Sequence, residues 1–121
     1  MTKKKNSKRY DLEERTLAFA KRVRKFVKKL PKTIANIEDI KQLVKASGSV
    51  GGNYREANEA LSKKDFRMRI KICRKESKES GYWLQLVDTN KKEELEADRK
   101  ELVNEATELM NIFGSILKKS E

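Results

Sequence analysis

The chain of 121 residues carries a formal net charge of +11, with 40% charged and 36% hydrophobic residues, and its length fits a single domain with one core. One proline and five glycines are too few for an all-β domain, and no apolar run approaches the roughly 18 residues that cross a bilayer, so we expect a cytoplasmic, helical protein that does not bind membranes. Because there is no histidine and only one cysteine, the usual zinc ligands and the commonest general base are missing, and we expect no metal, no cofactor and no enzymatic activity.

The first helix is predicted to follow a basic arm. Residues 1–10 have almost no apolar side chains, and we expect them to form a flexible N-terminal arm. Asp11 is a candidate N-cap, and Pro31 ends the helix, which therefore spans residues 11–30. Its apolar positions, spaced by three and four, are Leu12, Thr16, Phe19, Val23, Phe26 and Leu30.

The second helix is predicted to begin near Ile34, with Thr33 as its cap. Its expected buried positions are Ile37, Ile40, Val44, Ser47, Val50 or Gly51, Tyr54 and Leu61. Gly48, Gly51 and Gly52 each cost about 1 kcal/mol relative to alanine, so the middle of this helix is expected to be its weakest part.

Two further helices complete the predicted fold. Residues 62–65 resemble a capping box, and the apolar series that follows is Phe66, Ile70, Cys73, Ser77, Leu84 and Val87. Turn-forming residues 88–90 separate it from the series Leu95, Leu102, Ala106, Leu109, Phe113 and Ile116. Residues 11–121 are thus predicted to form an all-α domain, an up-down-up-down antiparallel four-helix bundle. A helical hairpin that dimerises is the alternative.

The positive charge is concentrated in two of these helices. Residues 1–32 hold 13 basic and 3 acidic side chains, and residues 62–90 hold 8 and 4. The second and fourth helices are close to neutral or slightly acidic. A helical wheel places Arg67, Lys71, Arg74 and Lys78 in one stripe beside the core, with Lys64 and Lys75 next to it. On the first helix, cations cover the face opposite the core, and Arg15, Arg22 and Lys29 line one side.

Such segregated charge favours binding to polyanions, because neutralised phosphates release counterions without regard to sequence. We therefore predict a surface that binds RNA or DNA largely without sequence specificity. Its predicted residues are Lys21, Arg22, Arg24, Lys25, Lys28, Lys64, Arg67, Lys71, Arg74, Lys75 and Lys78. Solubilising charge, a membrane surface and an acidic protein are the alternative explanations.

The aromatic residues predict an oligomer interface. Trp83 lies at the edge of the expected core, where an indole is costly to leave in water. We predict that Tyr54, Tyr82 and Trp83 contact another subunit. Base stacking by Tyr82 or Trp83 is the competing interpretation. Cys73 falls on the core face, where a thiol packs as a small hydrophobe.

Several segments together resemble a known family. The chain contains residues 49–57 (SVGGNYREA), 62–66 (SKKDF) and 75–84 (KESKESGYWL), preceded by residues 11–16 (DLEERT) and 30–33 (LPKT). These segments are similar to those of the four-helix-bundle proteins encoded in intervening sequences of 23S ribosomal RNA. The resemblance implies a ring-shaped homopentamer without known enzymatic activity. A related branch, the accessory variability determinant of diversity-generating retroelements, implies a reverse transcriptase and its template RNA as partners, so a protein-binding scaffold is the alternative function.

Overall fold

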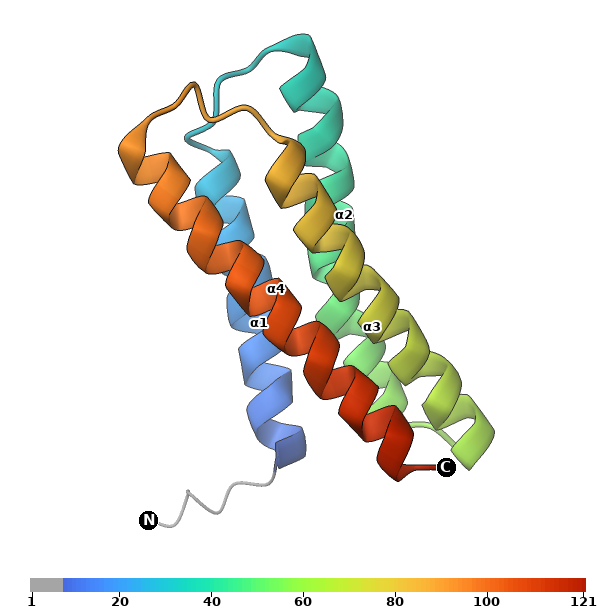
Figure 1. The fold of residues 1–121 in the computed structure, drawn as a ribbon. Helices are drawn as coiled ribbons and strands as arrows, with labels where there is room; N and C mark the ends of the chain where they lie inside the picture. Colours follow the sequence, from blue (N-terminus) through green and yellow to red (C-terminus); the bar gives the residue numbers. More distant parts are fainter. Residues whose placement is uncertain (1–7) are drawn as a thin grey trace.

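The computed structural model describes residues 8–121, which form four helices joined by short loops (Figure 1). The helices are α1 (Lys8–Val27), α2 (Ile34–Asn58), α3 (Lys63–Leu86) and α4 (Glu93–Lys119). Each runs antiparallel to the next, so the predicted up-down-up-down four-helix bundle is confirmed. Within residues 8–121, α1 and α3 each pack on α2 and α4 but not on one another, so they lie diagonally across the bundle. None of these helices is long and apolar enough to span a membrane.

The caps at the starts of α2 and α3 are those predicted. The side chain of Thr33 accepts a hydrogen bond from the backbone N–H of Asn36 at 3.1 Å, and that of Ser62 accepts one from Asp65 at 3.0 Å. The predicted cap at Asp11 is wrong, because α1 begins at Lys8 and includes this residue. Of the predicted N-terminal arm, residues 8–10 therefore belong to α1, whereas residues 1–7 lie outside the described part of the chain.

The buried face of α2 differs from the predicted one. Leu61 is 97% exposed, because α2 ends at Asn58 and Leu61 lies in the loop that follows. Ile37 is also exposed, whereas Leu43 and Ala46 are buried. The buried residues of α2 are Asn36, Leu43, Ala46, Ser47, Val50, Tyr54 and Ala57. Small side chains thus occupy much of this face, which allows its neighbours to approach closely.

The helix continues through its three glycines, and Gly51 marks its closest approach to α1. A Cβ atom at Gly51 would lie 2.8 Å from the Thr16 Oγ1 atom and 3.2 Å from its Cβ. Thr16 is buried, and its hydroxyl donates a hydrogen bond to the Leu12 carbonyl at 2.8 Å. At Gly52, by contrast, a Cβ atom would meet nothing within 4 Å. A Cβ atom at Gly48 would lie 3.2 Å from the end of the flexible Arg24 side chain, so of the three glycines Gly51 makes the tightest contact between α2 and α1.

Two loops are joined by one buried amide. The Nδ2 atom of Asn36 donates to the carbonyls of Pro31 at 2.9 Å and Asp88 at 2.8 Å, and its Oδ1 atom accepts from the Asp88 N–H at 2.8 Å. Pro31 lies in the loop between α1 and α2, and Asp88 lies in the loop between α3 and α4. The nitrogen and the oxygen of the buried Asn36 amide are thus both hydrogen-bonded.

Cys73 lies in the core of the bundle, as predicted. Burial raises the pKa of its thiol to about 12, so the reactive thiolate is strongly disfavoured at neutral pH. The thiol donates to the carbonyl of Val50 at 3.4 Å, across the contact between α3 and α2. Its role in the folded chain is therefore packing.

Candidate nucleic-acid interface

The predicted phosphate-binding cations fall on two separate faces of the bundle. One group belongs to α1 and consists of Lys21, Arg22, Arg24, Lys25 and Lys28. The other belongs to α3 and consists of Lys64, Arg67, Lys71, Arg74, Lys75 and Lys78. Because α1 and α3 lie diagonally across the bundle, the two groups do not form one continuous surface.

One side of α1 is paired with acidic residues of α4. The guanidinium of Arg15 binds Glu105 through two hydrogen bonds, of 2.7 and 2.9 Å, and Glu108 through a third, of 2.7 Å. The side chain of Glu105 is only 15% exposed, so water weakens this ion pair little. The bond to Glu105 is also the largest reason that the pKa of Arg15 is raised above its ordinary value.

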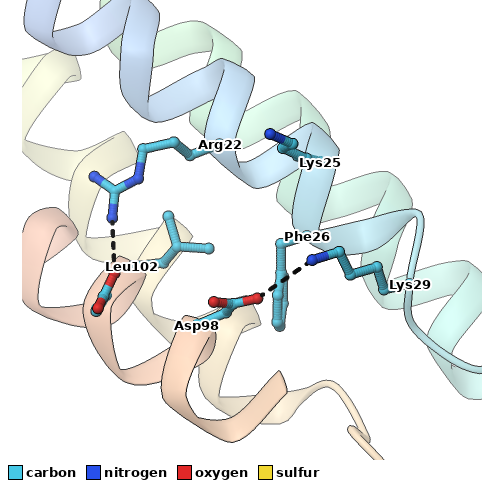
Figure 2. Close-up of a pocket in the computed structure, with 7 residues that line it drawn as sticks. Arg22, Lys25, Phe26, Lys29, Asp98 and Leu102 are labelled. Atoms are coloured by element: carbon cyan, nitrogen blue, oxygen red, sulfur yellow. Dashed lines mark ion pairs between the residues drawn. The ribbon is translucent and has the colours of Figure 1, made fainter. Parts of the chain in front are cut away.

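The same pairing continues along the bundle, as Figure 2 shows. Arg22 extends from α1 to within 3.8 Å of Glu101, and Lys29 lies 3.8 Å from Asp98. Lys29 also lies 3.4 Å from Glu94. These pairs border a shallow hollow of about 220 Å³ between the two helices. We call this row of pairs the α1–α4 seam. Its acidic side chains offset the cations that face them, and Arg22 of the predicted site is among those cations.

The seam could have been predicted from spacing. Arg15, Arg22 and Lys29 recur every seven residues. The acidic side chains of α4 that meet them recur at intervals of three and four, and they are Glu94, Asp98, Glu101, Glu105 and Glu108. Two stripes with matching period and opposite sign indicate neighbouring antiparallel helices.

Of the remaining cations of α1, Lys25 also lines the hollow beside the α1–α4 seam, whereas Lys21, Arg24 and Lys28 do not. Within the described part of the chain, Lys21, Lys25 and Lys28 are exposed and form no ion pair. Arg24 donates to the backbone carbonyls of Ala20 at 3.0 Å and Val44 at 3.5 Å. Lys21, Lys25 and Lys28 therefore keep their charge without an ion-pair partner among the described residues, although the hollow that Lys25 lines also carries the carboxylates of Asp98 and Glu101.

The cations of α3 have a different setting, on what we call the α3–α4 face. Its members are Arg67, Lys71, Arg74, Lys78, Gly81, Tyr82 and Gln85 of α3 with Thr107, Met110 and Gly114 of α4. None of these side chains is acidic. Lys71, Arg74 and Lys78 are exposed, and none of the three pairs with a carboxylate of residues 8–121. Of the neighbouring predicted residues, Lys64 is likewise unpaired there, and Lys75 lies 3.8 Å from Glu76.

Two arginines align the helices that form this face. Arg67, near the start of α3, donates to the carbonyl of Leu117 at 2.7 Å and to the Ser120 hydroxyl at 2.5 Å, at the end of α4. Arg99, near the start of α4, donates to the carbonyls of Leu84 at 3.2 Å and Val87 at 2.5 Å, at the end of α3. Each arginine therefore satisfies terminal carbonyl groups of the other helix. Arg67 is thus partly occupied by a structural role.

The three predicted interface aromatics occupy three different environments. Tyr54 is buried, and its ring centroid lies 5.8 Å from that of Phe113. Trp83 is half-buried against the core, whereas Tyr82 is 58% exposed. The ring centroids of Tyr82 and Trp83 are 4.9 Å apart, with an edge-to-face angle of 78°.

Two further hollows accompany these aromatics. Tyr54 lines a groove of about 550 Å³ between the N-terminal part of α1 and the C-terminal part of α4, which lie apart in Figure 1. Its other lining residues are Leu12, Arg15, Ile112, Ser115, Ile116, Lys119 and Ser120. Tyr82 lines a smaller hollow of about 280 Å³ between α3 and α4. Among residues 8–121, no group of three or more acidic or cysteine side chains could hold a metal ion.

Two comparisons place the chain among known proteins. A family model described as 23S rRNA-intervening sequence protein matches residues 8–115, which include α1, α2, α3 and most of α4. The crystal structure of a protein with unknown function from the S23 ribosomal protein family of Bacteroides thetaiotaomicron is similar over 93% of this chain and 99% of that chain, with 30% sequence identity and a TM-score of 0.79. No curated protein matches the chain. The description of the family names no enzymatic activity.

Proposed function

Because the chain belongs to the family of 23S rRNA-intervening sequence proteins, as its sequence segments predicted, we propose that it is a non-enzymatic bundle that binds nucleic acid through its α3–α4 face. The observation that carries the proposal is the contrast between two rows of cations. Those of the α1–α4 seam are offset by acidic residues, whereas Lys71, Arg74 and Lys78 are exposed and pair with no carboxylate of the described residues. Three unpaired cations on one rigid helix suit a phosphate backbone.

Binding of this kind carries little sequence information. Lysine and arginine contacts to phosphates fix position along a strand, and base edges are read by other groups. The α3–α4 face offers few such groups, and the sequence contains no helix motif typical of major-groove reading. RNA and DNA are therefore both proposed ligands.

A salt titration tests the proposal. Protein freed of copurified nucleic acid is titrated into labelled random-sequence RNA and DNA, single-stranded and duplex, while binding is followed by fluorescence anisotropy. We expect binding at about 50 mM salt that weakens with a log–log slope of about −2 for single strands, since each phosphate contact contributes about −0.7. No binding of any of the four ligands at low salt would reject the proposed function.

We also propose that the bundle forms a homo-oligomer, with the pentamer of the family resemblance as the expected state. Large apolar side chains that a single copy leaves exposed support this, among them Ile34, Leu61, Met68 and Leu86. An assembly repeats the α3–α4 face in each copy, and multivalent contacts raise affinity well above that of one copy. We expect light scattering to give a mass several times the 14.1 kDa of one chain. A mass of one chain at micromolar concentration would contradict this part of the proposal.

A scaffold for an acidic protein is the second candidate. The same exposed apolar side chains and the same cations would suit such a partner, for instance a reverse transcriptase. The salt titration separates the two functions, because a protein scaffold needs no affinity for free nucleic acid.

A further inference from the structure

An exposed aromatic ring continues the row of cations on α3. Arg67, Lys71, Arg74, Lys78 and Tyr82 follow one another at intervals of three or four residues, so they share one side of the helix. Positions 78 and 82 are about 6 Å apart along the helix axis. Tyr82 is 58% exposed, so the bundle leaves part of its side chain open to solvent. The four residues that precede it in the row are all cations.

The ring of Tyr82 packs against a neighbouring aromatic side chain. Trp83 meets it edge to face, with ring centroids 4.9 Å apart, and Trp83 itself packs against the hydrophobic core. Aromatic pairs in this geometry are favourable beyond the area they bury. Because one partner is anchored, the exposed ring has a restricted orientation before any ligand arrives, which lowers the entropic cost of binding.

A hollow of about 280 Å³ lies beside this ring, between α3 and α4. Gly81 lines it, and a Cβ atom there would lie 3.9 Å from the Ala106 Cβ, at ordinary contact distance. Its apolar lining includes Val103, Ala106 and Met110. Gln85 and Thr107 also line it and can donate and accept hydrogen bonds. An apolar hollow with a few polar groups suits a flat heterocycle.

Lys78 connects the hollow to the row of cations, because it lines the hollow and lies one turn from Tyr82. A nucleotide with its base against Tyr82 could therefore place a phosphate near Lys78, and the strand would continue towards Arg74 and Lys71. Among the described residues, neither Lys78 nor Arg74 pairs with a carboxylate that would compete for the phosphate.

We propose that the α3–α4 face binds single-stranded nucleic acid by stacking an unpaired base on Tyr82, and therefore selects single strands over duplexes. This inference rests on the proposed nucleic-acid binding and names its ligand class. Every base has a π-face, so stacking adds affinity without sequence preference. In a duplex the faces of the bases are already stacked on one another, and exposing one costs a few kcal/mol.

The test compares Tyr82→Ala with Tyr82→Phe, which keeps the ring. Both variants and the unchanged protein are titrated with single-stranded RNA, single-stranded DNA, abasic single strands and duplexes. We expect Tyr82→Ala to lose about tenfold in affinity for both single strands, within the range measured for base–aromatic stacking, and Tyr82→Phe to lose less than about twofold. Duplexes and abasic strands should bind all three proteins equally. A loss for RNA but not for DNA would restrict the ligand to RNA and support stacking on that strand.

Leu17→Ala is the matched control, because Leu17 is a large apolar side chain that is 45% exposed, lies on α1 diagonally across the bundle from α3, and does not line the hollow. It should bind single strands as the unchanged protein does. Equal losses for single strands and duplexes, or no loss with Tyr82→Ala, would overturn the stacking proposal while leaving phosphate binding intact. A change of mass in light scattering with Tyr82→Ala would place the ring against a second copy instead, and would also overturn it. If the unchanged protein binds no nucleic acid, the proposed function itself fails.

Discussion

A triple variant in which glutamine replaces Lys71, Arg74 and Lys78 is expected to bind nucleic acid about a hundredfold more weakly at low salt. The magnitude of its log–log slope of affinity against salt should also fall by about 2. These three cations are exposed, and none pairs with a carboxylate in the described chain, so each is available to a phosphate. Arg67 is left unchanged, because it holds the end of α4 through Leu117. The variant should therefore keep its helical content and its unfolding temperature.

The matched control is the replacement of Lys21, Lys25 and Lys28 with glutamine. It lowers the net charge of +11 by the same three units, but from exposed positions on α1, diagonally across the bundle. We expect its affinity to fall by less than about threefold, as for screened charges far from the contact surface. Equal weakening of binding by the two variants would show that total charge, and not the α3–α4 face, accounts for the affinity.

The second prediction concerns the free energy of unfolding of alanine variants at two adjacent glycines, Gly51 and Gly52. Gly52→Ala is expected to raise the free energy of unfolding by about 1 kcal/mol, the usual gain for alanine in a helix, because nothing lies within 4 Å of the added methyl group. Gly51→Ala brings the same gain in helix propensity, but its methyl group would lie 2.8 Å from the Thr16 Oγ1 atom. We expect a net loss of up to about 2 kcal/mol there, since overpacking in a close contact costs about 1–3 kcal/mol and the gain in helix propensity offsets about 1 kcal/mol of it.

Thr16 cannot easily yield to such a methyl group, because it is buried and its hydroxyl is bonded to Leu12. Urea unfolding of the two variants at one protein concentration measures the difference, and Thr16→Ala combined with Gly51→Ala should recover part of the loss. Equal stability of the two alanine variants would show that α1 moves away from α2 at little cost.

What the sequence predicted correctly is mostly local. Thr33 and Ser62 begin their helices as expected, because a cap depends on a side chain and a backbone N–H three residues away. Pro31 lies outside any helix for an equally local reason. Asp11 was misjudged, since acidic residues stabilise the first turns of a helix as well as its cap position, and α1 extends back to Lys8.

What the sequence did not predict depends on neighbouring helices. The phase of α2 was misjudged because the prediction followed the large apolar residues, such as Ile37, whereas the buried face includes Ala46 and Ser47. A helical wheel also treats each helix alone. It placed Arg15 and Arg22 on one side of α1, but the pairing with Glu105 and Glu101, about 80 to 90 residues further along the chain, emerges only when the stripes of α1 and α4 are compared with each other.

The candidate site was partly predictable for the same reason. The row of Arg67, Lys71, Arg74 and Lys78 follows from spacing within one helix, and the structure shows these residues on one face. Their freedom from acidic partners, and the hollow beside Tyr82, depend on which side of α4 faces α3. The hollow has no acidic lining residue, whereas five acidic residues of α4 pair with α1: Glu94, Asp98, Glu101, Glu105 and Glu108.

Arg67 and Arg99 also fix the register of α3 and α4. Each guanidinium reaches terminal carbonyls of the other helix, so sliding α4 by one turn, about 5.4 Å, would break both sets of bonds at once. An alignment in which α4 is shifted along α3 would therefore lose hydrogen bonds at both ends of this helix pair. The spacing between the cations of α3 and the polar groups of α4 is consequently fixed, so in the proposed oligomer a nucleic-acid strand that passed from one subunit to the next would meet the same pattern of contacts each time.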